Sequence, residues 1–386
     1  MNICGIIAEF DPFHNGHKFL IESARASGST HIAVVMSGSA VQRGTPAMFG
    51  KYKRASAALK SGADLVLEMP APYSCSNAEI FAKAGVTALA SLGDGVVSRL
   101  VFGSETADTE LIVEASFAAD ELRQSDRVKK LLSEGMNYPS AVCTAAEEGF
   151  GKEISSVLRN PNSTLALEYC RALRSSAPFI EPFAVARKGA LHNSTDTDGV
   201  TASGSKIREM ISHGEDVSAL MPSPLDDPCL PDRLDKIFLY KLLSADKDDL
   251  LSLPDVDPAI ADRILRVAER SFSRTEDFLA AARSKDITAA RLRRLAIHLV
   301  LGINKQDIAP LPYVRILALN ERGREILASG SHKLPTDTSL ARLEKTSAQA
   351  ARVSLIERRA SQLRALGTSS GSSVNEYTVS VKLTNS

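Results

Sequence analysis

A short apolar run is followed directly by a loop with two histidines. This feature limits the possible fold and function of the chain more than any other. Residues Ile3–Ala8 are apolar and suit one buried strand, and the next nine residues read Glu-Phe-Asp-Pro-Phe-His-Asn-Gly-His. His14 and His17 stand about one helical turn apart, and Gly16 between them lets backbone N–H groups approach a phosphate closely. Two imidazoles at a helix N-terminus suit the α-phosphate of a nucleoside triphosphate, so the motif predicts nucleotidyl transfer.

The alternative is that both histidines are ordinary loop residues bonded to neighbouring backbone groups. The context favours a functional role, because the pair follows a predicted buried strand, flanks a glycine and opens a helix. The first loop contains neither the GxGxxG of a dinucleotide site nor the GxxxxGK[ST] of a P-loop, which disfavours both. We expect imidazole donors that stabilise charge on the α-phosphate during in-line attack, with no covalent enzyme intermediate.

Strand and helix patterns alternate through the first hundred residues and predict an α/β fold. The expected strands are Ile3–Ala8, His31–Met36, Asp64–Met69, Arg99–Phe102 and, later, Phe179–Val185. The expected helices between them are Lys18–Ala26, Lys51–Ser61 and Ala78–Leu92. Nearly continuous apolar strands indicate a Rossmann-like parallel sheet covered on both faces, which binds ligands at the carboxyl ends of its strands. The loops that begin at Glu9, Ser37, Pro70 and Gly103 lie at that edge.

Helical periodicity dominates the rest of the chain. The helices expected there are Asp108–Ala119, Ser125–Ser133, Lys206–Ser212, Leu234–Leu243, Pro258–Phe272, Thr275–Ser284, Thr288–Leu301 and Ser339–Leu363. Four prolines in Met221–Asp232 mark a domain boundary. We therefore expect a nucleotide-binding domain at 1–222, a mainly helical domain at 233–366 and a disordered tail at 367–386, in which Tyr377–Leu383 could pair as an edge strand.

Composition limits the class of protein. The 386 residues include 46 basic and 46 acidic side chains, so any surface for a polyanion must be local. No apolar stretch approaches the roughly 20 residues of a membrane span, and the N-terminus lacks the basic start of a signal peptide. Five widely spaced cysteines without a CxxC pair fit neither a disulfide framework nor a structural zinc site. We expect a cytoplasmic protein without membrane contact.

A second candidate phosphate clamp lies in the segment Ala202–Arg208. Ser203 and Ser205 place hydroxyl groups before a predicted helix, and Arg208 falls in its first turn. Hydroxyls, helix N–H groups and a guanidinium together bind phosphate well. The alternative is an ordinary N-cap followed by a surface arginine. The position of the segment beyond the last predicted strand favours the clamp.

Seven segments carry a recognisable family pattern. They are Glu9–His17, Val35–Gly38, Gln42–Ala47, Lys60–Pro70, Phe102–Glu105, Pro161–Leu165 and Arg187–Ala190. In this order they resemble the bacterial tRNA(Met) cytidine acetate ligases, members of the HxGH nucleotidyltransferase-like superfamily. The first segment specifies only the superfamily, whereas the Gln-Arg-Gly-Thr-Pro and Pro-Asn-Ser-Thr-Leu segments narrow it to the ligase. The resemblance is clear over residues 1–215 and faint beyond, chiefly at Tyr313–Leu327.

The resemblance implies an ATP-dependent ligase that activates acetate as acetyl-adenylate. The acetyl group would then pass to the exocyclic amine of the wobble cytidine in elongator tRNA(Met), with Mg²⁺ at the phosphates. His14, His17 and Arg208 are the expected catalytic residues. With the clamp serines included, the expected ATP-binding residues are Ile7, Ala8, Glu9, Phe10, Asp11, Pro12, Phe13, His14, Asn15, Gly16, His17, Lys18, Phe19, Leu20, Gly103, Asn162, Arg187, Ser203 and Ser205.

Two positions depart from the family pattern. Asp11 stands where the family usually has asparagine, and an acidic side chain near phosphates would repel them unless it faces a metal ion or a base. Ser163 and Ala166 replace the usual asparagine and glycine near Asn162.

Basic residues elsewhere suggest two further roles. Arg43, Lys51 and Lys53 could assist the reaction, with a solvated basic face as the alternative. The segment Thr288–Leu327 carries seven basic and three acidic residues, which favours a tRNA surface over an ordinary charged helix face only weakly. The expected tRNA-binding residues are Arg291, Arg293, Arg294 and Arg315, the last forming a stacking pair with Tyr313. His298, on an apolar stretch, is expected in the core.

Two other functions stay open from the sequence. One is a small-molecule nucleotidyltransferase that releases pyrophosphate, which leaves the basic helical half unexplained. The other is a non-catalytic, nucleotide-sensing RNA-binding protein, and the retained His14, Gly16, His17 and Arg208 argue against it. The sequence does not indicate the oligomeric state.

Overall fold

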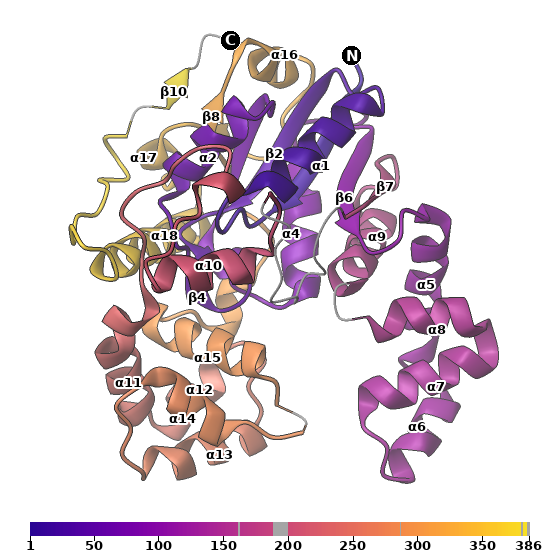
Figure 1. Cartoon of the computed structure of the whole chain (residues 1–386), viewed down its shortest axis with the longest axis vertical. Coiled ribbons are helices and arrows are strands. Elements are labelled where there is room, and N and C mark those ends of the chain that lie inside the picture. The colour runs from indigo at the N-terminus through magenta and orange to yellow at the C-terminus, as the bar shows by residue number, and fades with distance from the viewer. Residues whose placement is uncertain (161–162, 188–199, 286, 380, 384–386) are drawn as a thin grey trace.

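The computed structural model describes residues 1–160, 163–187, 200–285, 287–379 and 381–383 (Figure 1). Within these residues an eight-stranded sheet forms the centre. Its parallel strands, in order across the sheet, are β5 (Leu65–Met69), β2 (His31–Ser37), β1 (Ile3–Ala8), β6 (Arg99–Ser104) and β7 (Glu181–Ala186). Beyond β5, antiparallel to it, lies β8 (Val314–Leu319), which also pairs with β9 (Thr336–Asp337) and β10 (Lys382–Leu383).

Helices cover both faces of this sheet, as the nearly continuous apolar strands predict. On one face Ile6 and Val34 pack against α1 (Asn15–Ala26) and α2 (Lys51–Lys60). On the other face Ile7 and Val35 pack in the core that includes α4 (Ala78–Ala90) and α9 (Thr164–Ser176). Successive residues of one strand point to opposite faces, and both faces are buried. The α/β prediction is confirmed.

The expected strands of the N-terminal half are all present, each within two residues of its predicted ends. α1 begins at Asn15, three residues earlier than expected, because the side chain of His14 caps it. The sequence analysis did not predict the short hairpin of β3 (Ala40–Val41) and β4 (Thr45–Pro46), nor the short α3 (Ala71–Ser74).

Two helical groups extend from the sheet (Figure 1). The first, inserted between β6 and β7, consists of α5 (Thr109–Leu122), α6 (Asp126–Ser133), α7 (Tyr138–Phe150) and α8 (Lys152–Arg159), followed by α9. The second consists of α11 (Asp235–Ser244), α12 (Lys247–Ser252), α13 (Pro258–Ala268), α14 (Thr275–Ala282) and α15 (Ala289–Leu301). Among the described residues, no helix combines the length and the apolar character that crossing a bilayer requires.

The C-terminal half differs from the expected single helical domain at 233–366. After α15 the chain returns to the sheet through β8, α16 (Glu321–Ala328) and α17 (Leu340–Leu343). The last helix, α18 (Ala348–Leu366), is shared, since Val353 belongs to the core of the sheet and Ile356 to the core of the second helical group. All six residues of β8 are buried, which is the pattern of a strand covered on both faces.

Five buried charged residues, which we call the Lys51 cluster, join the two halves of the chain. Lys51 contacts Glu68 on β5 and lies 3.0 Å from a carboxylate oxygen of Glu357 on α18 and 3.0 Å from one of Glu376. Arg315 on β8 lies 2.6 Å from Glu376. No member is more than 4% exposed. The three carboxylates and two cations neutralise most of one another's charge away from water.

For the described residues 367–379, the Lys51 cluster corrects the disorder expected of the tail at 367–386. Glu376 enters the interior, where its carboxylate also accepts a hydrogen bond from the hydroxyl of Tyr52 at 3.1 Å. Burial alone would raise the pKa of Glu376, but Lys51 and Arg315 outweigh burial and hold that pKa below its ordinary value. The tail has few apolar residues, so composition predicted disorder, whereas the contacts of Glu376 with Lys51, Arg315 and Tyr52 hold this part of it against the interior.

Replacing Glu376 with alanine is expected to lower the free energy of unfolding by about 3 kcal/mol, because the change leaves two buried cations with fewer counter-charges. Urea unfolding at neutral pH measures the loss. Glu344→Gln is the control: Glu344 accepts an exposed hydrogen bond from Tyr377 in the same segment, so this variant should stay within about 0.5 kcal/mol of wild type. Equal stability of the two variants would contradict the role of Glu376.

Candidate functional site

Buried hydrogen bonds hold the turn after β1. Phe10 has a positive φ of 50°, which costs a residue other than glycine about 1–3 kcal/mol. The carboxylate of Asp11 accepts a hydrogen bond from the backbone N–H of Met48 at 2.7 Å. The wholly buried guanidinium of Arg54 donates to the carbonyl of Glu9 at 2.7 Å. These hydrogen bonds compensate the backbone strain at Phe10. They also give a role for the acidic side chain of Asp11, because its carboxylate holds the backbone of the neighbouring loop at Met48.

His14 and His17 form the N-terminal cap of α1. Nδ1 of His14 accepts from the backbone N–H of Gly16 at 3.0 Å, and Nδ1 of His17 accepts from the backbone N–H of His14 at 3.3 Å. The two ring centroids are 3.8 Å apart. Because Nδ1 is the acceptor in each ring, the proton of the neutral imidazole lies on Nε2. Each ring therefore carries its N–H on the side opposite its backbone partner.

Aromatic packing fixes the ring of His17. The centroids of Phe10 and Phe13 lie 4.8 and 5.7 Å from the imidazole centroid, and both phenyl rings are buried. Pro12 is buried as well. These three residues were expected to bind ATP, but their side chains form the packing beneath the site.

The Ser203–Arg208 segment lies against the histidine loop, as predicted. Ser203 is the N-cap of α10 (Gly204–Ser212). Arg208 donates from Nη1 to the backbone carbonyl of Asp11 and from Nη2 to the hydroxyl of Ser205 at 2.9 Å. Since Asp11 precedes the histidines by only a few residues, this contact places the N-terminus of α10 at the same point as that of α1.

Gly204 is the position of closest approach. A Cβ built on Gly204 would lie 3.6 Å from Nε2 of His14 and 3.4 Å from Nη1 of Arg208. These are ordinary van der Waals separations, so the first turn of α10 lies beside the imidazole of His14. Two helix N-termini, with their partial positive charges, meet there.

Arg43 completes the cationic side of the site. From the β3–β4 hairpin it lies 3.3 Å from a carboxylate oxygen of Glu9 and 3.5 Å from the hydroxyl of Ser205. Burial would raise the pKa of Glu9, but the charges of Arg43 and Arg208 outweigh burial and lower it. Burial lowers the pKa of Arg208 to about 10, so Arg208 stays charged at neutral pH. Arg208 also lies 3.8 Å from a carboxylate oxygen of Asp11, so two guanidiniums and two carboxylates face one another here.

The remaining residues of the first segment have structural positions. The side-chain amide of Asn15 donates to the carbonyls of Val200 and Ala219 at 2.8 and 2.9 Å, which ties α1 to the α10 region. Lys18 is exposed and lies 3.7 Å from Glu22. Ile7 is buried at the end of β1, Ala8 follows it, and Phe19 and Leu20 are half-buried on α1.

Gly103 and Arg187 lie together at the ends of β6 and β7. Nη2 of Arg187 donates to the carbonyl of Gly103 at 3.4 Å. Both residues therefore stand at the carboxyl edge of the sheet, on the first and second strands beyond β1, where the nucleotide contacts were predicted. Asn162, the third residue expected there, lies outside the described residues.

The structure corrects two of the basic residues. Lys51 belongs to the buried Lys51 cluster and cannot reach a ligand. Lys53 is exposed and lies 2.7 Å from the exposed Asp226, so its expected role stays a prediction. Arg315 and Tyr313 are at most 1% exposed, so neither can bind or stack on tRNA. Arg315 lies inside the Lys51 cluster, where its guanidinium is paired with Glu376.

The three arginines of α15 already have partners or partial burial. Arg291 donates to the carbonyl of Asp255 at 2.7 Å, and Arg293 forms a two-pronged pair with Glu276 at 2.9 and 2.8 Å. Arg294 is half-buried. To bind phosphates, Arg293 would have to exchange its carboxylate partner.

His298 is a core residue, as expected. It is 1% exposed, its Nε2 lies 2.9 Å from the carbonyl of Cys75, and burial lowers its pKa to about 4.

Arg54 is the site residue that the sequence analysis missed. Its guanidinium donates to the carbonyls of Glu9, Ser37 and Phe49 at 2.7, 3.0 and 2.9 Å, and so connects the loops after β1 and β2. A signal was present: Arg54 stands three residues before Ala57, on the alanine-rich face of α2 that packs on the sheet.

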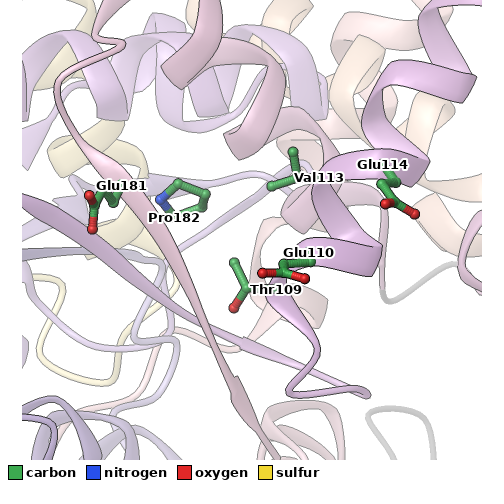
Figure 2. Close-up of a pocket in the computed structure, with 6 residues that line it drawn as sticks. All are labelled: Thr109, Glu110, Val113, Glu114, Glu181 and Pro182. Carbon is green, nitrogen blue, oxygen red and sulfur yellow. The ribbon is translucent and has the colours of Figure 1, made fainter.

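A surface hollow of about 430 Å³ contains none of the site residues named above in its lining (Figure 2). It is lined by Thr109, Glu110, Val113, Glu114, Glu181 and Pro182. The carboxylates would repel phosphates. The hydroxyl of Thr109 accepts a hydrogen bond from the backbone N–H of Ala184 on β7 at 3.0 Å, so the hollow adjoins the edge of the sheet.

Comparisons with known proteins agree with this geometry. A family model described as HIGH Nucleotidyl Transferase matches residues 1–377. The chain is 33% identical over 364 residues to a tRNA(Met) cytidine acetate ligase of Syntrophotalea carbinolica, with 89% of this chain and 86% of that protein covered. It is 32% identical over 387 residues to a protein of the same name in Caldicellulosiruptor saccharolyticus, with 95% and 94% covered.

Solved structures show the same architecture. Apo Thermotoga maritima TmcAL superimposes with a TM-score of 0.86 at 26% sequence identity, with 95% of each chain covered. The crystal structure of that protein bound with alpha-thio ATP gives a TM-score of 0.82 at 25% identity, again with 95% of each chain covered.

Asp11→Asn is expected to keep the free energy of unfolding within about 1 kcal/mol of wild type, because the amide oxygen can still accept from the buried N–H of Met48. Asp11→Ala leaves that N–H without its partner and should cost about 1–3 kcal/mol. Urea unfolding of both variants tests this. Equal losses would show that the negative charge, rather than the hydrogen bond, is what the site needs.

Proposed function

Because the chain belongs to the family of tRNA(Met) cytidine acetate ligases, within the HIGH nucleotidyl transferases, we propose that it activates acetate with ATP and transfers the acetyl group to the wobble cytidine of elongator tRNA(Met). The observation that carries this proposal is the placement of Gly204 at the start of α10, where an added Cβ would lie 3.6 Å from Nε2 of His14. Imidazole donors and two helix ends then converge where a triphosphate would bind.

In the first step a carboxylate oxygen of acetate attacks the α-phosphorus of ATP. The bond between that phosphorus and the oxygen that bridges to the β-phosphorus breaks, and pyrophosphate leaves with the bonding electrons. His14 and His17 donate from Nε2 to the phosphate oxygens, where negative charge increases in the transition state. Arg208 and Arg43 stabilise the same charge from the other side.

In the second step the exocyclic amine of cytidine attacks the carbonyl carbon of acetyl-adenylate. The bond from that carbon to the AMP oxygen breaks, AMP leaves, and the amine loses a proton to solvent. Free acetate is a poor acyl donor, whereas the mixed anhydride is an activated one. Binding the anhydride beside an unstacked anticodon base makes the transfer effectively intramolecular.

Mg²⁺ is part of the proposal as an ion that the triphosphate brings. The described residues contain no group of three histidine, cysteine or acidic side chains arranged for a metal, and Mg²⁺ commonly uses one or two carboxylates together with substrate phosphates. Glu9 is the carboxylate that fits, since its Oε1 is buried and has no hydrogen-bond partner among the described residues. When bound, the ion would neutralise phosphate charge.

The tRNA is proposed to lie along the second helical group. Arg291 and Arg293 stand on α15 at the tip of the β3–β4 hairpin: a Cβ on Gly44 would lie only 2.4 Å from the backbone of Arg293. A tRNA held there would be close to Arg43. We place the reaction in the cytoplasm, where tRNA and ATP occur together.

The direct test is incubation of the protein with labelled acetate, ATP and elongator tRNA(Met), followed by mass spectrometry of the tRNA nucleosides. We expect one acetyl group on the wobble cytidine, dependent on ATP, with AMP and pyrophosphate released. Pyrophosphate release with a phosphorylated metabolite, and no label in tRNA, would favour the small-molecule nucleotidyltransferase instead. Nucleotide binding without any release would indicate the sensing protein.

His17→Ala is expected to slow acetyl-adenylate formation at least 100-fold, because one donor to the phosphate is lost. The melting temperature should fall only slightly, since one cap contact is worth about 1 kcal/mol. His213→Ala, at an exposed histidine 3.6 Å from Glu215, is the control and should keep full activity. A loss of activity that merely follows the loss of folded protein would make His17 a structural residue.

A further inference from the structure

Glu357 makes contacts that none of the predicted site residues explains. It lies on α18, wholly buried, more than 300 residues from the histidine loop. One carboxylate oxygen accepts from the backbone N–H of Ser39 at 2.8 Å and contacts Lys51 at 3.0 Å. The other accepts from the backbone N–H of Ala71 at 2.7 Å. The carboxylate thus binds the loops that follow β2 and β5.

Gly38 shows how closely the loop fits this carboxylate. A Cβ on Gly38 would lie 2.6 Å from Oε2 of Glu357, a separation that real Cβ atoms do not reach. The backbone N–H of Gly38 also donates to the carbonyl of Met69 at 2.8 Å. The loop after β2 is therefore fixed between β5 and α18.

The same loop continues into the hairpin that carries Arg43. Its base is closed by a hydrogen bond from the backbone N–H of Ala47 to the carbonyl of Ser39 at 2.9 Å. Ser39 is also the residue that Glu357 holds. The position of Arg43 beside Glu9 and Ser205 therefore depends on a carboxylate from the C-terminal helix.

We propose that Glu357 is a positioning residue for adenylate formation: by holding the backbone at Ser39 and Ala71, its carboxylate sets the place of Arg43 at the phosphate end of the site. This inference rests on the proposed function. Glu357 itself touches no substrate, and it acts through the hairpin. A displacement of about 1 Å in a group that binds the transition state can cost about 100-fold in rate.

The test is acetate-dependent exchange of pyrophosphate into ATP by the full-length chain. In Glu357→Gln the side-chain nitrogen cannot accept, so one of the two backbone bonds is lost, and kcat/KM for ATP should fall about 10- to 100-fold. Arg43→Gln should show a similar fall. Because both changes act on the same group, the double variant should be no worse than Arg43→Gln alone.

Glu376→Gln is the matched control. It removes a carboxylate from the same Lys51 cluster but touches neither Ser39 nor Ala71, so exchange per folded molecule should equal that of wild type. If Glu357→Gln does not fold, Gly38→Ala replaces it, because the added methyl group displaces the carboxylate from the loop side while the charge is retained. Gly38→Ala should show the same 10- to 100-fold fall.

The inference would be overturned by wild-type exchange in Glu357→Gln, by wild-type exchange in Arg43→Gln, or by losses that multiply in the double variant. An equal loss in the Glu376→Gln control would also overturn it, since it would point to the cluster's charge alone. Failure of the proposed function is a separate result, because wild type itself would then show no acetate-dependent exchange.

Discussion

The fold depends on a small volume in which three carboxylates and two cations are kept away from water. Lys51 and Glu68 come from the first seventy residues, whereas Arg315, Glu357 and Glu376 come from the last seventy-two. Burial of an unpaired charge is prohibitively costly, so neither half of the chain can keep its part of the cluster without the other. Burial raises the pKa of Glu68, which favours a retained proton and brings the count of charges closer to balance. For this reason the N-terminal sheet and the C-terminal segments form one structural unit around these residues.

The sequence predicted those parts of the structure that depend on residues close together in the chain. Apolar runs between helical patterns identified β1, β2, β5, β6 and β7, and the spacing of His14 and His17 around Gly16 identified the cap of α1. The meeting of the Ser203–Arg208 segment with that cap was also foreseen, because both lie at the same edge of a parallel sheet. In each case the inference needed only neighbours in sequence and one general rule of topology.

What the sequence could not show is determined by partners far along the chain. From the sequence, Arg315 was expected to bind tRNA, but in the structure its guanidinium is paired with Glu376. Lys51 was expected to assist the reaction, but three buried carboxylates surround its amino group. The sequence predicted that the carboxylate of Asp11 would repel phosphates, whereas in the structure this carboxylate accepts a hydrogen bond from the backbone N–H of Met48. The residues next to a charged side chain in the sequence do not show whether it will be a buried counter-ion or will contact a ligand. These assignments therefore required the structure.

The outer strand β7 has a further consequence. Its residue Pro182 has no N–H to offer, and the N–H of Ala184 is already taken by the hydroxyl of Thr109. Exposed strand edges recruit strands from other molecules and so promote aggregation, and native proteins block them in this way. Neither of these two positions on β7 therefore offers an N–H to a strand of another molecule, which disfavours intermolecular β-pairing along this margin of the sheet.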